Sequence, residues 1–441
     1  MRKSIFKVGF SRKDITPDVL PVFLNTGIPL TEVGEKIYTT CVALNDGEST
    51  ALILSVDAKA IIRQHDEGVK KAINERTGVP IENIMINCLH NHSSLCPGVP
   101  ESESVMRWTN ERYYPSCIES AVGAIEDLCD SEVYYGTGKT TNFAFVRRYI
   151  HEDGTFSSIN MRKKSSTPIV AHESEADDTV QFIRFVREGK KDVLIANWQA
   201  HAAHAAIRAG VILGDYIYHF RNGIEASDEG LLFSYYCGAS GNINLTVKIP
   251  ERNVCDADYI KVGKKLSEVV LAGLGDAKKI ETGKIKSALE YHKFRYRTIP
   301  AERFEKAQEI VQYQNDKEKY NALMDENGFM SALDVHYTIS VGRKGGVEIE
   351  MPFGVIACGE LAFVSVPYEM FDTNGMAIKE SSPYKTTFIL TLTGDCAGYV
   401  PSALAVKNGG FECYMTLFEY GTAEFGEQIL KNMINNIYEK D

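Results

Sequence analysis

The chain has 441 residues, 44% of them hydrophobic, and a formal net charge of −11, so it can bury a large core. The acidic balance excludes the basic face that duplex-binding proteins need, since the only dense basic stretch is the short segment Arg162-Lys163-Lys164. No window approaches the ~20 apolar residues of a membrane span. The ten cysteines show no paired spacing, and the N-terminus lacks the apolar core of a secretory leader. We therefore expect a cytoplasmic protein with reduced thiols.

Apolar runs alternate with amphipathic stretches along the first half of the chain, a pattern that is typical of α/β proteins. Strands are predicted at 51–56 and 84–87, with a helix around 69–73 between them and a long helix at 113–128. Residues 133–190 show a less regular pattern that predicts neither a clear strand nor a clear helix.

The second half continues the alternation of strands and helices. The predicted elements are strands at 193–197 and 231–235, helices at 256–271 and 302–325, a strand pair at 354–357 and 361–366, a strand at 388–390, a loop from 394 to 410 and a final helix at 424–438. No repeat or linker interrupts this order, so we expect a single large domain that covers residues 1–441.

Four of the ten histidines follow predicted buried strands. His90 and His92 follow the strand at 84–87, and in an extended segment residues two apart point the same way. His201 and His204 follow the strand at 193–197 with the spacing of neighbours on one helical face. A hydrolytic zinc centre takes three or four nitrogen or oxygen ligands from separate elements and leaves one position for water. The two strand ends therefore suggest a metal site.

A carboxylate and a phenol follow two further strands. Glu369 lies just after Pro367, which stops the strand at 361–366, and Tyr399 lies in a glycine-bracketed loop after the strand at 388–390. A glutamate in such a position is usually exposed to solvent, and tyrosine is an uncommon zinc ligand, so these residues alone leave both roles open.

Read in order, these segments resemble the catalytic domain of the neutral, non-lysosomal ceramidase family, over residues 8 to about 430. Leu89-His90-Asn91-His92-Ser93-Ser94 resembles the family's Thr-His-Thr-His-Ser-Gly, and Asn197 to His201 resembles its Asn-Trp/Phe-x-x-His. The remaining matches are Pro367-Tyr368-Glu369 with Pro-Gly-Glu, Tyr399-Val400-Pro401 with Tyr-Val/Ile-Thr/Pro, and Val146-Arg147-Arg148-Tyr149 with the Asn-Arg-Arg-Tyr/Phe of bacterial members.

The resemblance implies a large α/β catalytic domain with mixed β-sheets flanked by helices. It implies that Zn²⁺ is bound by four residues, His90, His201, Glu369 and Tyr399. This ligand set leaves the ion a net Lewis acid, which prepares water to attack an amide carbonyl at neutral pH. His92 would then lie beside the reacting carbonyl and pass a proton to the leaving amine, and Arg147 would stabilise the oxyanion.

The sequence also departs from the family pattern. Phe411 stands where the family has a tyrosine twelve residues after the ligand tyrosine, so one hydroxyl is missing. Gly241-Asn242-Ile243 replaces the family's Gly-Asp-Val, and the family's C-terminal sandwich domain has no counterpart before residue 441. We expect His204 to be structural or pocket-lining, and Asp215 to orient a ligand or cap a helix.

These observations favour a zinc-dependent hydrolase that cleaves an N-acyl amide, either ceramide-like or smaller and soluble. Two alternatives stay open. One is a zinc enzyme that cleaves esters, lactones or carbohydrate derivatives, and the other is a binding protein without catalysis. In each case the expected partner is a small molecule, with no nucleic acid and no stable membrane insertion.

Overall fold

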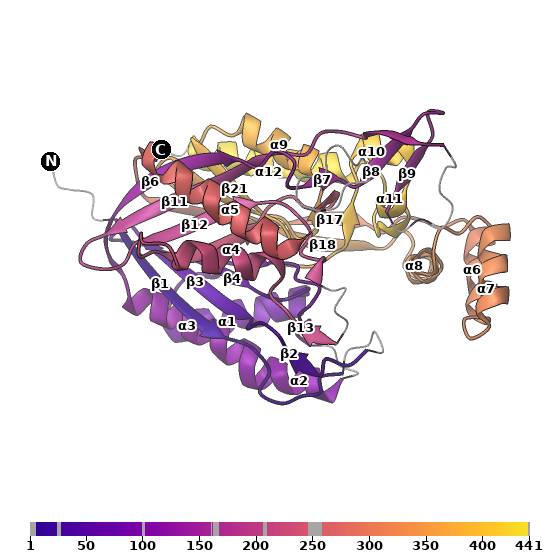
Figure 1. Cartoon of the computed structure of the whole chain (residues 1–441), viewed down its shortest axis with the longest axis horizontal. Helices are drawn as coiled ribbons and strands as arrows, with labels where there is room; N and C mark the ends of the chain where they lie inside the picture. The colour runs from indigo at the N-terminus through magenta and orange to yellow at the C-terminus, as the bar shows by residue number, and fades with distance from the viewer. Residues whose placement is uncertain are drawn as a thin grey trace.

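A computed structural model describes residues 6–23, 28–98, 102–159, 161, 167–205, 210–245 and 258–439 (Figure 1). The basic stretch at 162–164 and the start of the helix expected at 256–271 lie outside these residues. Within them, two large β-sheets share a hydrophobic core and are covered by helices on their other faces. The expected α/β fold with mixed sheets flanked by helices is therefore confirmed.

The larger sheet has nine strands in the order β14-β12-β11-β6-β1-β3-β4-β5, with β16 paired to β6. Their bounds are β1 Lys7–Asp14, β3 Tyr38–Asn45, β4 Thr50–Val56, β5 Ile84–Cys88, β6 Cys129–Lys139, β11 Thr179–Arg187, β12 Val193–Trp198, β14 Leu232–Cys237 and β16 Lys278–Lys279. The pairs β4–β5 and β12–β14 are parallel, and the other neighbours are antiparallel.

Strong curvature of this sheet brings its two ends together. β14, at one end of the strand order, contacts β4 and β5 at the other end. At this contact the Tyr236 hydroxyl donates to the Ile53 carbonyl at 2.9 Å, and the Ser55 and Ser234 hydroxyls lie 3.1 Å apart. Loops that leave β5 and β12 therefore reach the same region, although these strands are far apart in the sheet order.

Alternation along the strands decides which residues face which layer. In β4, Ile53 faces the core that the two sheets share, and Leu52 and Leu54 face the helices. The helices on this outer face are α1 Arg63–Thr77, α3 Tyr114–Glu126, α4 Asp215–Glu225 and α5 Tyr259–Gly273. Each presents an apolar stripe, as in α5, where Val262, Leu266 and Val270 recur every four residues.

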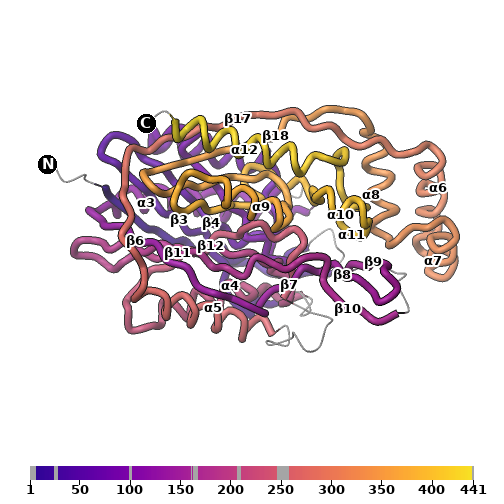
Figure 2. The backbone as a smooth tube through the Cα atoms, turned by 90° about the horizontal axis from the view of Figure 1, so that it is seen from above, coloured from indigo at the N-terminus to yellow at the C-terminus, as the bar shows by residue number. Residues whose placement is uncertain are grey.

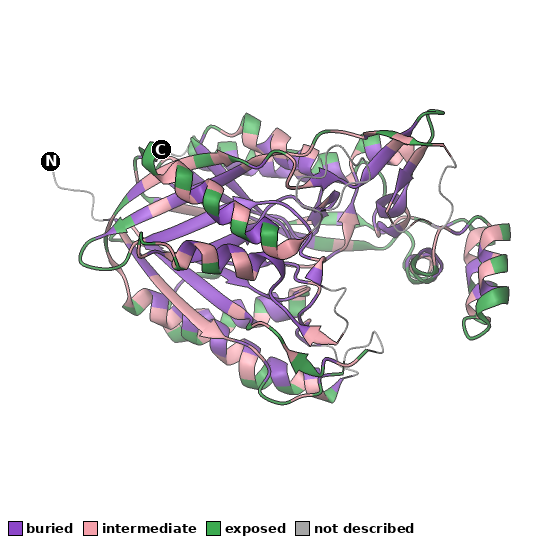
Figure 3. Ribbon diagram, viewed as in Figure 1, coloured by how far each residue is buried: buried purple, intermediate pink, exposed green. Residues whose placement is uncertain are grey.

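The smaller sheet has the order β17-β18-β19-β21. These strands are β17 Ile285–Arg295, β18 Glu348–Cys358, β19 Leu361–Ser365 and β21 Thr386–Leu390. One face meets the larger sheet, and the other is covered by α9 Asp372–Ser381 and α12 Thr422–Tyr438. Because β19 and β21 are buried on both faces, they consist almost entirely of apolar and threonine residues. Figure 3 shows that the strands of the body are mostly buried, whereas the surrounding helices also carry exposed residues.

Three helices are inserted between β17 and β18: α6 Ala301–Val311, α7 Lys317–Glu326 and α8 Ala332–Gly342. They form a small core of their own, and α6 and α7 project from one end of the molecule (Figure 2). α8 lies closer to the body and packs against α11 Phe411–Met415.

Most predicted elements are confirmed, but three predictions are wrong. Residues 133–190 contain β6 and β11 of the larger sheet and four short strands, β7 Phe145–Val146, β8 Arg148–His151, β9 Phe156–Ser158 and β10 Ile169–His172. β6 escaped prediction because it carries glycines and polar residues. One of these, Gly136, leaves space for the Phe182 ring, which would lie 2.3 Å from an added Cβ.

The other two errors concern segment boundaries. The helix expected at 302–325 is two helices, because Asp316 accepts from the Lys319 amide and starts α7 anew. The loop expected at 394–410 contains β22 Tyr399–Val400 and α10 Ala403–Asn408, which are too short to give a periodic pattern. Across the described part of the chain, no helix combines the length and apolarity needed to cross a bilayer.

We expect Gly9→Ala to destabilise the fold, because the added Cβ would lie 1.9 Å from the backbone oxygen of Ala124 and would force β1 away from α3. The predicted loss is about 1–3 kcal/mol in the free energy of unfolding, measured by urea denaturation. The control is Gly275→Ala, where no atom lies within 4 Å of the added Cβ. Equal stability of the two variants would contradict the close approach of β1 and α3.

Candidate metal centre

The first pair of histidines follows β5 through a strained turn. His90 has φ of 55°, in the left-handed region that few residues other than glycine adopt. The expectation of an extended segment from His90 to His92 is therefore wrong. The turn is held by Leu89 N, which donates to Val56 O, and by Asn91 N, which donates to Ala58 O, each at 3.0 Å. Such strain, held by the surrounding backbone, is typical of functional sites.

His201 lies in the loop that follows β12 and is 1% exposed. Its backbone amide donates to Ile243 O at 3.2 Å, and its Nδ1 donates to Ser240 O at 2.8 Å. Ser240 belongs to the turn after β14, the parallel neighbour of β12. The motifs that resemble the family include the adjacent Gly241-Asn242-Ile243, but nothing in the sequence identified Ser240 as a partner of His201.

Glu369 and Tyr399 reach the same place from the end of the smaller sheet. They face each other in the parallel pair of β20 Glu369–Met370 and β22. Glu369 Oε2 lies 3.0 Å from His201 Nε2 and 3.5 Å from His90 Nε2, and the Tyr399 hydroxyl lies 3.3 Å from His201 Nε2. The four residues predicted as metal ligands thus converge. Glu369 is buried, not exposed as its position after Pro367 alone would indicate.

The tautomers of both histidines are set by backbone carbonyls. His90 Nδ1 donates to Lys59 O and His201 Nδ1 donates to Ser240 O, each at 2.8 Å. A neutral imidazole that donates from Nδ1 carries a lone pair on Nε2. Burial, with a smaller effect from Arg147, lowers the pKa of His201 to about 4, so this ring is neutral at pH 7.

Glu369 adds a negative charge to these lone pairs. Burial alone would raise the pKa of Glu369, but the interactions with His90 and His201 outweigh burial and hold it well below the usual range. The Nε2 atoms of His90 and His201 therefore face a buried carboxylate, an arrangement that favours a bound cation. Imidazole nitrogen and carboxylate oxygen are ligands that suit Zn²⁺, so the donor set fits this metal.

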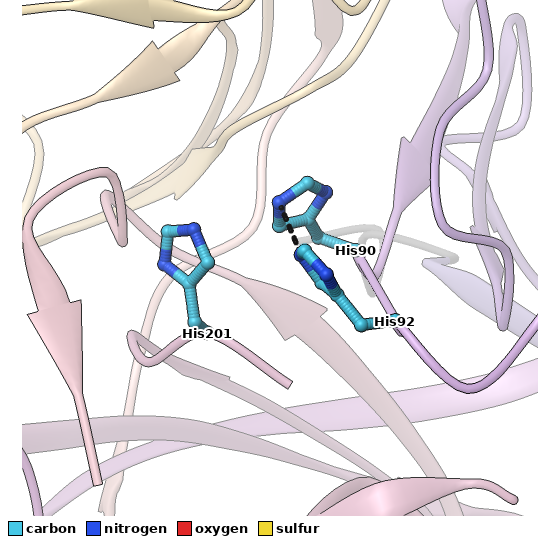
Figure 4. Close-up of side chains that lie close together, drawn as sticks. All are labelled: His90, His92 and His201. Carbon is cyan, nitrogen blue, oxygen red and sulfur yellow. Dashed lines mark hydrogen bonds between the residues drawn. The ribbon is translucent and has the colours of Figure 1, made fainter. Parts of the chain in front are cut away.

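His92 lies beside His90 and His201, as Figure 4 shows. Its Nε2 is 3.1 Å from His90 Nε2, and the potential ligand atoms of His90, His92 and His201 all lie within 4.8 Å of one another. His92 is half-buried, and burial followed by the neighbouring His90 and His201 lowers its pKa well below the usual value.

Arg147 lies beside Tyr399 in a buried network of charges. Its Nε donates to Glu412 Oε1 and its Nη2 to Gly241 O, each at 2.9 Å, and its guanidinium carbon is 5.3 Å from the centre of the Tyr399 ring. Burial and the charge of Glu369 raise the pKa of Tyr399, and Arg147 opposes this rise. The sequence analysis did not identify Glu412, because the only feature that distinguishes this acidic residue in the sequence is its position next to Phe411.

Three further residues discussed above also have clear positions. The Phe411 ring packs edge-on against Tyr399, with ring centres 5.9 Å apart, so an apolar side chain adjoins the site where the family has a hydroxyl. The side chain of His204 interacts with the backbone of His201, and burial lowers the pKa of His204 to about 4. Asp215 accepts from the amides of Ala205 and Tyr216 at 2.7 Å, so it fixes the loop after His201 rather than capping α4, whose N-cap is Gly214.

Comparison with known proteins identifies the architecture. The chain matches no protein-family model and no curated protein sequence. Among solved structures, it matches neutral ceramidase from Pseudomonas aeruginosa with a TM-score of 0.73 and 15% identity, over 99% of this chain and 75% of that one. It also matches a structure described as ceramidase complexed with C2, with a TM-score of 0.74 and 14% identity, over 99% and 76% of the two chains. The chain has the fold of neutral ceramidase. The resemblance read from the motifs is therefore confirmed at the level of the fold.

The close packing around Glu369 makes Gly241 a sensitive position. A Cβ added to Gly241 would lie 2.5 Å from the backbone oxygen of Glu369. We expect Gly241→Ala to displace Glu369 and lower the affinity for a divalent metal ion by roughly 10–100-fold, the usual effect of disturbing the residues that support metal ligands. Titration of the metal-free protein with Zn²⁺ measures this, and Gly275→Ala is the control. Unchanged affinity in Gly241→Ala would contradict this placement of Glu369.

Proposed function

We propose that the protein is a zinc-dependent amidohydrolase that cleaves an N-acyl amide and binds the metal through His90, His201, Glu369 and Tyr399. The observation that carries the proposal is the convergence of the Nε2 atoms of His90 and His201 on the buried carboxylate of Glu369, while each Nδ1 donates to a backbone carbonyl. The fold of neutral ceramidase supports an amide as the bond that is cleaved. His90, His201 and Glu369 come from separate segments, as the three protein ligands of catalytic zinc sites do, and Tyr399 would be a fourth ligand.

When bound, the divalent metal ion supplies Lewis acidity, which polarises an amide carbonyl and lowers the pKa of water. His92 is placed to handle the proton. It is half-buried, its ring touches those of His90 and His201, and its backbone amide donates to Ala202 O at 2.8 Å, which fixes its position. A neutral imidazole there accepts a proton as water attacks and delivers it to the leaving amine.

Arg147 holds Tyr399 and provides positive charge at the oxyanion side of the site. Its contacts with Glu412 and Gly241 fix the guanidinium group, so no reorganisation is needed when negative charge develops nearby.

Phe411 favours a second candidate function, hydrolysis of esters or lactones, because the site lacks one hydroxyl donor and esters need less help to expel their leaving group. A panel of N-acyl amines, lactones and uronic-acid glycosides separates the two, since our proposal requires turnover of N-acyl amines.

The two members of the second histidine pair provide a matched test. We expect His201→Ala to bind far less than one equivalent of zinc and to lose at least a hundredfold in amidase activity, because a ligand is removed. His204→Ala is the control, which should retain zinc, because this side chain contacts the backbone of His201 and not the ligand cluster. Metal analysis by mass spectrometry gives the answer, and a full equivalent of zinc in purified His201→Ala would overturn the ligand assignment.

A second variant separates the proton-handling role from metal binding. We expect His92→Ala to keep its zinc and its KM while kcat for an N-acyl amine falls by about 10²–10⁴-fold, the contribution usual for a general acid–base group. Steady-state kinetics together with metal analysis measure both properties. Loss of zinc from His92→Ala would instead make His92 a ligand, as its place among the three clustered imidazoles allows.

A further inference from the structure

We propose that Asp57 and Arg221 are positioning residues for the candidate metal centre. Their buried ion pair fixes the segment 56–59, and this segment in turn holds His90 in the tautomer that presents Nε2 to a metal ion. The inference rests on the metal-dependent function proposed above and extends the site to α4, which carries none of the proposed ligands. Neither residue belongs to the motifs that resemble ceramidases.

The segment 56–59 supports the turn that carries His90. Each of its four backbone carbonyls accepts a hydrogen bond from the segment 89–94. In chain order, the donors are the Leu89 amide at 3.0 Å, the Ser94 hydroxyl at 2.5 Å, the Asn91 amide at 3.0 Å and His90 Nδ1 at 2.8 Å. The last of these bonds sets the tautomer of His90. A shift of the segment 56–59 would therefore move the turn and release the imidazole.

Asp57 ties this segment to α4 through the ion pair. Arg221 Nη2 donates to both carboxylate oxygens of Asp57 at 3.0 Å, and the Arg221 and Asp57 side chains are 4% and 1% exposed. Asp57 also accepts from the Tyr38 amide at 2.9 Å, and the Arg221 guanidinium carbon lies 5.0 Å from the centre of the Tyr38 ring. The carboxylate is thus held from two directions, by the start of β3 and by α4.

The composition of this pair indicates a role in position rather than in stability. Two charges that are removed from water gain little net stability from each other, and apolar residues of similar volume often stabilise a core better. Among the residues that the structure describes, Arg221 Nη1 is also buried without a hydrogen-bond partner, which costs further free energy. The pair provides a fixed geometry instead, because a buried charge that leaves its partner stays uncompensated.

The same helix also supports the loop of the second histidine ligand. At its first residue, Asp215 accepts at 2.7 Å from a backbone amide in the loop that follows His201. Just before the helix, Leu213 O accepts from the side-chain amide of Asn91 at 2.7 Å. Since α4 is linked to the supports of both imidazoles, the ion pair sets how the turn of His90 lies relative to the loop of His201.

The test replaces the pair with neutral side chains of similar size in the double variant Asp57→Asn/Arg221→Met, which leaves no uncompensated charge in the core. We expect titration of the metal-free protein with Zn²⁺ to give an affinity about 10–100-fold lower than that of the wild type, the usual effect of removing residues that support metal ligands. Arg221→Lys should keep most of the affinity, because a single nitrogen makes both contacts with Asp57.

A second measurement reports on His90 itself and needs neither metal nor turnover. Proton–nitrogen NMR correlations of the imidazoles distinguish the two tautomers in the metal-free protein, and His90→Ala identifies the His90 signals. We expect His90 of the wild type to carry its proton on Nδ1, and the double variant to give a mixture of tautomers. His201, whose Nδ1 donates to Ser240 O, should keep its tautomer in both proteins.

The control is the double variant Arg12→Met/Glu225→Gln. It removes an ion pair of 2.7 Å that also joins α4 to the larger sheet, through β1. Among the described residues, neither member of this pair forms a hydrogen bond with the segment 56–59. The control should therefore leave both the affinity for Zn²⁺ and the His90 tautomer unchanged.

The tautomer separates this proposal from the proposed function. If His90 keeps the Nδ1 tautomer in full in Asp57→Asn/Arg221→Met, the positioning role is overturned, whatever the enzyme hydrolyses. If the wild type binds no Zn²⁺, the zinc-dependent function fails, and a mixture of tautomers confined to the double variant still supports the role of Asp57 and Arg221.

Discussion

The site depends on two hydrogen bonds from imidazole to backbone carbonyl, His90 Nδ1 to Lys59 O and His201 Nδ1 to Ser240 O. Each bond fixes a tautomer and thereby turns an Nε2 lone pair towards Glu369. With the opposite tautomers, the two histidines would carry protons on Nε2 and could donate to the carboxylate of Glu369 without a metal. The carbonyls are therefore as important to the chemistry as the side chains, and both belong to loops whose positions the sheets determine.

The sheets are aligned by two buried asparagines, one ahead of each proposed histidine ligand. The Asn87 side-chain amide donates to Thr391 O at 2.6 Å, and its oxygen accepts from Cys237 N at 2.8 Å. The Asn197 side-chain amide donates to Tyr236 O and Ile389 O at 3.0 and 2.9 Å. Each asparagine thus ties the larger sheet to the end of β21. Because unpaired backbone groups are costly in a core, these contacts fix how the sheets meet and bring Tyr399 to the histidines.

Much of the fold and of the candidate site could be predicted from the sequence, because the ends of buried strands are marked by clear patterns of residues. Apolar runs such as 84–87 and 193–197 predict buried strands, and polar side chains directly after them predict a site. Local patterns could not reveal how a curved sheet brings β14 against β5, since that depends on packing between residues distant in the chain. They also could not reveal the left-handed turn at His90, the buried partner Glu412, or the carbonyl of Ser240, because neither backbone geometry nor pairing has a periodic signature.

The buried charges beside the site form a network that holds Arg147 in place. Glu412 is fully buried and accepts from both Arg147 and Arg148, and Arg148 also pairs with Glu173. Such a network is rarely stabilising compared with apolar packing, and a partner removed from it leaves an uncompensated charge. Its members are therefore committed to one another and keep Arg147 against Tyr399 in a single position.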